Sequence, residues 1–175
     1  VLYLLWGCQT LTPSGSAGEA DPRLMAKASL PAHLPGEYYV YDDGTSTLVT
    51  EVVDGLVAWR HHNGATSKGY SNFIIPDLAW SSAEHSSEGR TSAPADLLWP
   101  LTAGRLERFT FEQTITPLDG TPPYRVTRNW TCRVEGTTSV TVPAGRFDTI
   151  VIACDRDADT RGLPGITRRF FYAPE

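Results

Sequence analysis

The stretch Thr47-Leu48-Val49-Thr50-Glu51-Val52-Val53-Asp54-Gly55-Leu56-Val57-Ala58-Trp59-Arg60 decides the fold class. Two runs rich in β-branched residues, 47–53 and 56–60, flank the dipeptide Asp54-Gly55. An Asp-Gly pair readily adopts the positive φ angles of a type I′ turn, and that turn matches the twist of a β-hairpin. The sequence therefore predicts an antiparallel hairpin at residues 47–60.

Similar runs occur on both sides of this hairpin, and they predict strands at 37–41, 70–75, 106–116, 124–134, 139–142, 147–154 and 167–172. The alternation of apolar and polar residues in 106–116 places Phe109, Phe111 and Ile115 on the inner face. The nearly continuous apolar run 147–154 predicts a central strand. Roughly nine short strands without a strong helix predict an all-β fold, with an antiparallel curved sheet that forms a half-barrel, a barrel or a sandwich.

Length and composition limit the class of protein. The chain has 175 residues, which is enough for one domain and a tail. Fifteen basic and 20 acidic residues give a net charge of −5, which argues against nucleic acid or an anionic membrane surface as a partner. Hydrophobic residues at 41% and charged residues at 20% are typical of a folding chain. No apolar run reaches the ~20 residues of a membrane-spanning helix.

The N-terminus reads Val1-Leu2-Tyr3-Leu4-Leu5-Trp6-Gly7-Cys8. It resembles the end of a bacterial lipoprotein signal peptide, in which a small residue precedes a Cys that is lipidated. Gly7 matches this motif, whereas Trp6 departs from it. The resemblance implies lipidation of Cys8, and Gln9 in the next position would favour the outer membrane of a Gram-negative cell. A plain signal-peptide core or the end of a membrane anchor, with an incidental cysteine, is the alternative.

Three parts of the chain follow from these observations. We expect residues 1–8 to be the end of a signal peptide, 9–35 a flexible linker or tether, and 36–175 the β domain. The linker is rich in small and breaker residues. Its segment 21–28 predicts either two helical turns, with Asp21 as the N-cap, or irregular chain. Because the sequence does not begin with Met, we expect an upstream piece.

Export makes the other two cysteines interpretable. With Cys8 lipidated, Cys132 and Cys154 are an even pair in an oxidising compartment, and both lie in predicted strands. In a simple antiparallel pair, however, Cys132 would lie nearer Thr149 than Cys154. A disulfide therefore requires a shifted register, or a parallel or cross-sheet approach. Two buried free thiols are the alternative.

Three motifs resemble a group of uncharacterised bacterial envelope domains. They are Trp99-Pro100-Leu101-x-x-Gly104, Val142-Pro143-Ala144-Gly145-Arg146-Phe147-Asp148-Thr149 and Tyr172-Ala173-Pro174-Glu175. Members of the group carry a V-P-A-G-x-F-D-T segment, end near Y-x-P-E and usually continue beyond it. The resemblance covers residues 95–175. It implies an exported protein or lipoprotein with a curved antiparallel sheet, somewhat like the half-barrels of lipoprotein carriers, and it implies no activity.

The second of these motifs also has a structural interpretation. Pro143 is expected to end a strand and Gly145 to turn the chain, because the one lacks an N–H and the other tolerates unusual φ angles. We expect Phe147 to fill the core and Asp148 to bind the backbone of the turn.

The sharpest polar motif is Asp155-x-Asp157-x-Asp159. Alternate carboxylates can bind an oxygen-seeking cation such as Ca²⁺. An EF-hand loop would require Gly and Glu where the chain has Thr160 and Ile166. The preferred interpretation is a solvated hairpin tip, and the sequence predicts no metal or other cofactor.

Histidines offer a weaker case for a metal. His61 and His62 are adjacent and point to opposite faces of an extended strand, so they are poor ligands for one ion. His85, with Glu84 and Glu88, lies in the stretch 76–98, which predicts a long irregular loop. Zinc binding there competes with the simpler interpretation of solvated loop residues. No motif of a triad hydrolase is present in the sequence.

Aromatic residues are the other candidates. Four tryptophans, Trp59, Trp80, Trp99 and Trp130, can line a curved sheet and hold an apolar or sugar ligand, or they can be core residues. We expect Trp80 to be the most exposed of them.

Two classes of function remain. The first is a non-enzymatic lipoprotein of the Gram-negative envelope, facing the periplasm and acting as an accessory subunit or binding module of a membrane-associated or periplasmic complex. Its partners would be the membrane, through a lipid on Cys8, and a protein of the envelope, with no nucleic acid. The alternative is a metal-dependent or hydrolytic periplasmic enzyme that uses His85 or the Asp155 cluster.

Overall fold

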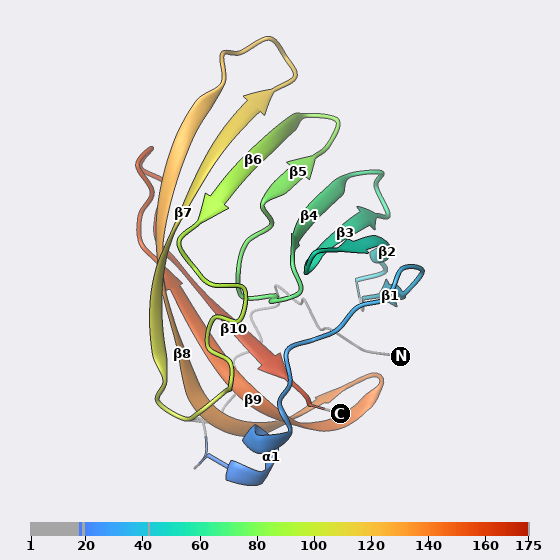
Figure 1. Cartoon of the computed structure of the whole chain (residues 1–175), viewed down its shortest axis with the longest axis vertical. Coiled ribbons are helices and arrows are strands. Elements are labelled where there is room, and N and C mark those ends of the chain that lie inside the picture. Colours follow the sequence, from blue (N-terminus) through green and yellow to red (C-terminus); the bar gives the residue numbers. More distant parts are fainter. Residues whose placement is uncertain (1–17, 19, 42, 175) are drawn as a thin grey trace.

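The computed structural model describes residues 18, 20–41 and 43–174. Ten strands form one antiparallel sheet, and each strand pairs with its neighbours in sequence from β1 to β10. Figure 1 shows this sheet as a strongly curved, open surface whose concave side is crossed by the longer connections. The prediction of an all-β fold with an antiparallel curved sheet is confirmed. The elements are α1 (Pro22–Lys27), β1 (Tyr38–Val40), β2 (Ser46–Val53), β3 (Leu56–His61), β4 (Thr66–Tyr70), β5 (Ala79–Ser81), β6 (His85–Thr91), β7 (Leu106–Pro117), β8 (Tyr124–Val142), β9 (Gly145–Arg156) and β10 (Ile166–Tyr172).

The hairpin at β2 and β3 forms as the sequence predicts. Asp54 and Gly55 have φ angles of 52° and 75°, so the two-residue turn supplies the two positive angles that a type I′ turn requires. A bulge between Val49 and Glu51 shifts the register of the pair within the first strand. The bulge adds twist and bends this end of the sheet.

The expectations for the middle of the chain are wrong in two places. The predicted strand 70–75 is not formed, because the chain leaves the sheet after Tyr70 and crosses the concave side. The buried amide of Asn72 fixes this crossing: its Nδ2 donates to Ala95 O and Leu97 O. The predicted loop 76–98 contains β5 and β6, whose small serines carry no apolar period but fit a pleated sheet.

Two strands expected at 124–134 and 139–142 are one strand, β8. A bulge between Val134 and Gly136 absorbs Glu135, and the strand continues to Val142. The carboxylate of Glu135 accepts from Arg133 Nη2 at 2.8 Å and lies 3.2 Å from Arg169 Nε, which holds the bulge in place. The pair Glu135-Gly136 was expected to end a strand, whereas it forms part of a bulge.

The β8–β9 hairpin closes as the motif predicts, with Val142 opposite Gly145, whose φ is 135°. Two details of the motif are wrong. Phe147 is half-buried and belongs to neither described core cluster. Asp148 accepts from Ser139 Oγ across the hairpin instead of binding the turn backbone. The reason is position, because this tip extends beyond the paired ends of β7 and β10.

The main core lies on the concave side of β7–β10. Crossing segments that include Ile74, Leu98 and Trp99 cover this side, as do Met25 and the half-buried side chains around α1. The helical alternative for 21–28 is the one observed, with Asp21 Oδ1 accepting from Arg23 N at 2.8 Å. Tyr172 of β10 donates to Ser29 O. A domain boundary near residue 35 stays a prediction. Within the described ranges, no helix is long and apolar enough to cross a membrane.

Candidate functional site

Two hollows on the described part of the sheet are candidates for a functional site. One, of about 630 Å³, lies on the face that carries Lys68 and Glu88 and is lined mainly by Thr, Ser and Ala residues, with Trp59 and Trp80 also bordering it. The other, which we call the concave cavity, has a volume of about 400 Å³ on the opposite face. Its lining comes from β2, β3, β4, β5 and β10 and from the crossing segment 71–77, and it includes aromatic and titratable groups. The concave cavity is therefore the stronger candidate for a functional site.

An aromatic wall forms one side of the concave cavity. Trp59, Ser67 and Trp80 lie directly opposite one another on adjacent strands, so their side chains share the concave face. The ring of Trp80 lies 4.7 Å from that of His61 at an angle of 40°. The edge of His33 packs against Trp59 with ring centres 4.8 Å apart. These contacts hold the wall in a fixed arrangement.

A polar chain runs beside this wall. His61 Nε2 lies 3.1 Å from Ser67 Oγ, and the hydroxyl of Ser67 is also hydrogen bonded to Asp77. Asp77 can approach β4 because residue 69 is glycine: a Cβ there would lie 2.8 Å from Asp77 Oδ1. Side chains from two strands and a crossing segment thus meet at one point in the cavity.

Burial sets the charges of the side chains in this polar chain. Burial raises the pKa of Asp77, although the hydrogen bond from Ser67 opposes this effect. Burial and the charge of His62 both lower the pKa of His61. A neutral imidazole that donates its Nε2 proton to Ser67 leaves the hydroxyl proton for Asp77. In this arrangement the serine is a relay between two side chains and is not activated as a nucleophile. The polar chain of His61, Ser67 and Asp77 is suited to orienting polar groups toward a ligand.

His33 closes the wall on its far side. Its side chain is almost fully buried, and Nδ1 lies 3.1 Å from Tyr39 Oη and 3.3 Å from a carboxylate oxygen of Glu37. Burial lowers the pKa of His33, while the hydrogen bond and charge of Glu37 oppose this effect. The residue is therefore held neutral near pH 7, where its ring packs on Trp59.

The three aspartates of the candidate calcium motif have separate structural roles, and the interpretation as a solvated hairpin tip is wrong for Asp159, which is buried. Asp155 accepts from Thr167 Oγ1 across β9 and β10. The backbone N–H of Asp157 donates to Asn129 O. Asp159 Oδ1 accepts from the backbone of Arg161 and Leu163, which closes the β9–β10 loop. Among the residues that the structure describes, no group of three His, Cys, Asp or Glu side chains is arranged to hold a metal ion.

The other candidate metal ligands lie in the β5–β6 hairpin. His85 begins β6, and the turn before it is organised by Ser82, whose Oγ accepts from the backbone of Glu84 and His85. Glu88 lies further along β6 on the outer face, opposite Ala79. These side chains therefore lie apart along the turn and the strand and do not meet at one metal site.

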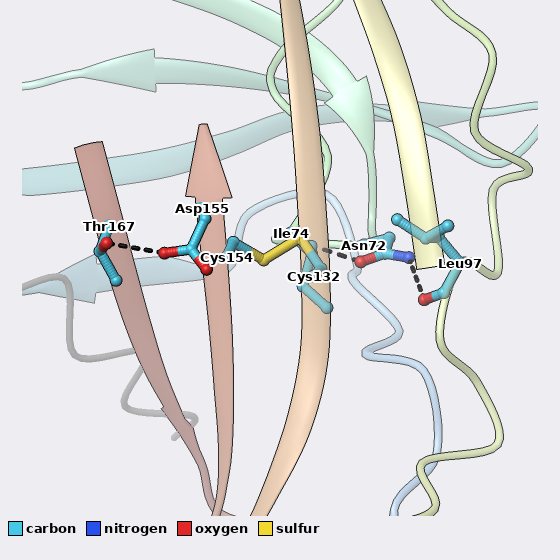
Figure 2. The surroundings of a disulfide bond; sticks show 7 residues. All are labelled: Asn72, Ile74, Leu97, Cys132, Cys154, Asp155 and Thr167. Carbon is cyan, nitrogen blue, oxygen red and sulfur yellow. Dashed lines mark hydrogen bonds between the residues drawn. A yellow bond between two sulfur atoms is a disulfide. The ribbon is translucent and has the colours of Figure 1, made fainter. Parts of the chain in front are cut away.

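Figure 2 shows Cys132 and Cys154 joined on neighbouring strands. The residues are directly opposite in the β8–β9 register, their Cα atoms are 4.1 Å apart, and both side chains are fully buried. In a simple antiparallel pair Cys132 was expected to lie nearer Thr149 than Cys154. That expectation is wrong because β8 does not end near residue 134. The Glu135 bulge shifts the register by one residue, and without it Cys132 would face Asp155 instead. The lipidation candidate Cys8 lies outside the described residues.

The tryptophans divide between the two interpretations that the sequence left open. Trp99 and Trp130 are buried in the main core. Trp59 and Trp80 are half-buried and line the concave cavity. The cavity is also lined by Ser67, Asp77 and Arg168, which no sequence pattern singles out, since each is an isolated polar residue in an ordinary strand or turn context. The only local signal is Gly69, whose missing Cβ makes room for a neighbour.

Comparison with known proteins gives a fold relationship. No protein-family model matches this sequence, and none of the curated proteins matches it. A solved structure, described as that of the hypothetical lipoprotein YmcC from Escherichia coli (K12), is similar with a TM-score of 0.54 and 10% sequence identity. The match covers 74% of this chain and 66% of the other, so this chain spans slightly less than two thirds of that protein. At this identity the likeness establishes the fold alone: this chain and the E. coli protein share a curved antiparallel sheet.

Proposed function

We propose that this protein is a non-enzymatic, lipid-anchored binding module of the bacterial envelope that holds a small ligand in the concave cavity. The single observation that carries the proposal is the aromatic wall of Trp59 and Trp80 beside the polar chain of His61, Ser67 and Asp77. A concave site of several hundred Å³ with apolar walls and a few fixed polar groups is the usual form of a ligand site.

The chemistry of the wall indicates the class of ligand. Indole rings offer flat apolar faces, and the adjacent hydroxyl, imidazole and carboxyl groups offer donors and acceptors. An apolar molecule with a polar end, or a sugar ring, matches this combination. Hydrogen bonds among His61, Ser67 and Asp77 fix these groups before a ligand arrives, which reduces the entropy lost on binding.

The proposed location rests on the N-terminus and on the fold relationship. The sequence before Cys8 resembles a lipoprotein signal peptide, and the structural neighbour is described as a hypothetical lipoprotein. We propose a lipid on Cys8, a periplasm-facing position in a Gram-negative envelope and an accessory role beside a protein partner.

Metabolic labelling tests the anchor. The full-length precursor, expressed in a Gram-negative host with radioactive palmitate, should incorporate label into the mature chain, and Cys8→Ser should abolish it. Cys132→Ser is the control, because a buried core cysteine should not affect labelling. A soluble mature protein whose N-terminus lies elsewhere would disprove the anchor and leave the cavity unaffected.

Native mass spectrometry tests the cavity. Protein purified gently from the envelope should carry a non-covalent ligand that Trp80→Ala reduces at least severalfold. Tyr38→Ala is a matched control, since this aromatic residue is exposed on the edge strand β1. Equal ligand retention in the two variants would remove the cavity from the proposal.

A hydrolase is the second candidate, because Ser67 Oγ lies within reach of His61 Nε2. Nucleophilic catalysis would require His61 to take the serine proton, whereas Asp77 competes for that proton. A fluorophosphonate probe distinguishes the two functions: covalent labelling that Ser67→Ala abolishes would favour the hydrolase over the binding module.

A further inference from the structure

Three arginines gather on the concave face at the β8–β10 end of the sheet. Trp130 lies directly opposite Arg156, and Arg128 precedes Trp130 by two residues on the same face of β8. Arg168 of β10 lies two residues beyond the partner of Arg156, and its guanidinium carbon is 5.6 Å from the centre of the Trp130 ring. We call Arg128, Arg156 and Arg168 the arginine cluster.

Charge is unbalanced between two members of the cluster, Arg128 and Arg156. Arg128 and Arg156 both act on one carboxylate, that of Asp159, which is itself buried. Arg128 Nε lies 3.8 Å from Asp159 Oδ2, which is too long for a hydrogen bond. Burial and the charge of Arg156 lower the pKa of Arg128, so the two guanidinium groups repel each other in a poorly solvated place. Two cations share one anion in a chain whose net charge is −5.

Other hydrogen bonds satisfy only part of these side chains. Arg128 Nη1 donates to Gln113 Oε1, and Arg156 Nη2 donates to Pro164 O at 2.8 Å. The Nε–H groups of both arginines and the indole N–H of Trp130 are buried without an acceptor in the structure. A buried donor left unpaired destabilises the folded state, and more so when it is charged. Three such donors on one face therefore indicate an acceptor that the chain does not supply.

A bridging water explains only part of this pattern. One water between Arg128 Nε and Asp159 Oδ2 would satisfy both atoms across their 3.8 Å separation. The donors of Arg156 and Trp130 would still be unpaired, and the excess positive charge would remain. An anion within reach of these donors would satisfy them and offset the charge together. Guanidinium groups present parallel N–H donors at the spacing of two oxygens in one oxyanion.

We propose that the arginine cluster binds an oxyanion group, a phosphate, sulfate or carboxylate, carried by a ligand that enters through the concave cavity. Arg168 connects the two places, because it lines the cavity and also lies over Trp130. The route of entry rests on the proposed function, whereas the anion contacts do not depend on it. A ligand with an apolar or sugar body against Trp59 and Trp80 and an anionic end at the arginines would span the hollow.

Titration with inorganic phosphate at constant ionic strength tests the cluster without knowledge of the natural ligand. In ¹⁵N-labelled protein, we expect saturable shifts of the Nε–H signals of Arg128 and Arg156 and of the Trp130 indole. Arg156→Gln should weaken phosphate binding at least tenfold. Arg168→Gln should weaken it severalfold, and because that residue is exposed the variant carries little risk of misfolding. Arg125→Gln, on the outer face of β8, should leave binding unchanged.

Further experiments identify the source of the anion, and they separate the anion site from the proposed ligand site in the concave cavity. Sulfate and acetate compare tetrahedral with planar oxyanions, and vesicles with or without phosphatidylglycerol compare a lipid headgroup with a free anion. Loss of the native ligand in Trp80→Ala with phosphate binding intact would support the cluster and the cavity separately. Shifts that do not saturate, or that are equal in wild type, Arg156→Gln and Arg168→Gln, would overturn the anion site.

Discussion

Burial governs the two histidines beside the aromatic wall. It lowers the pKa of His33 and of His61, although Glu37 opposes the effect at His33. In the unfolded chain each imidazole has a pKa near 6.5, so below that pH the unfolded state binds more protons than the folded state. The stability that these residues contribute is present above pH 6.5 and is lost as the pH falls.

Urea unfolding should show this dependence. We expect the free energy of unfolding to fall between pH 7.5 and 5, with at most about 1.4 kcal/mol per pH unit from each histidine. His33→Gln should flatten the slope, whatever it does to the overall stability. His85→Gln, in the β5–β6 hairpin, is the control and should retain the slope of the wild type. An unchanged slope in His33→Gln would contradict the role assigned to burial.

Gly69 matters because of what a side chain would displace. A Cβ at this position would lie 2.8 Å from Asp77 Oδ1 and 3.2 Å from Asp77 Cα, so the crossing segment would have to move. We expect Gly69→Ala to cost roughly 1–3 kcal/mol in urea unfolding. Asp77→Asn should be neutral or stabilising at pH 7, because burial raises the pKa of this carboxyl and disfavours its charge. A fully tolerated Gly69→Ala would show that the segment is not tightly seated.

At the level of elements, the sequence predicts strands best where turn residues restrict the backbone. Asp54-Gly55 and the Pro143–Gly145 turn fall where expected, since their φ requirements are local. The strand end expected at Glu135 is wrong because a bulge depends on other strands, here on the register with β9 and on Arg169 of β10 beside the Glu135 carboxylate. The serine-rich β5–β6 hairpin has no hydrophobic period, so its pairing becomes visible only in the folded sheet.

The β8–β9 pair carries a prediction about its cysteines. Because Cys132 and Cys154 are opposite one another and 22 positions apart, oxidation closes a loop of about 20 residues. Peptide mass spectrometry of the unreduced native protein should find them bonded. The double variant Cys132→Ser with Cys154→Ser should lose stability by about 3 kcal/mol, through release of the unfolded chain and loss of packing. Two alkylatable thiols in the native protein would show packed, reduced cysteines instead.

At the scale of the whole molecule, sequence patterns do not predict which residues form the candidate site. His33, His61, Asp77 and Arg168 come from separate parts of the chain and meet only because the sheet curves and a segment crosses its hollow. Trp59 and Trp80 do line the hollow of the curved sheet, while ligand binding by them stays a proposal. The sequence could not distinguish them from Trp99 and Trp130, since an indole in a strand has the same local context in a core and in a cavity.

The central claim is that the concave cavity is the working site. The most direct measurement follows the indole N–H signals of ¹⁵N-labelled protein while small molecules extracted from bacterial envelopes are added. The account predicts shifts at Trp59 and Trp80, none at Trp99, which is packed in the core, and a shift at Trp130 when the bound molecule is anionic. Signals of Trp59 and Trp80 that stay in place while residues of the opposite face, such as Lys68, shift would contradict it.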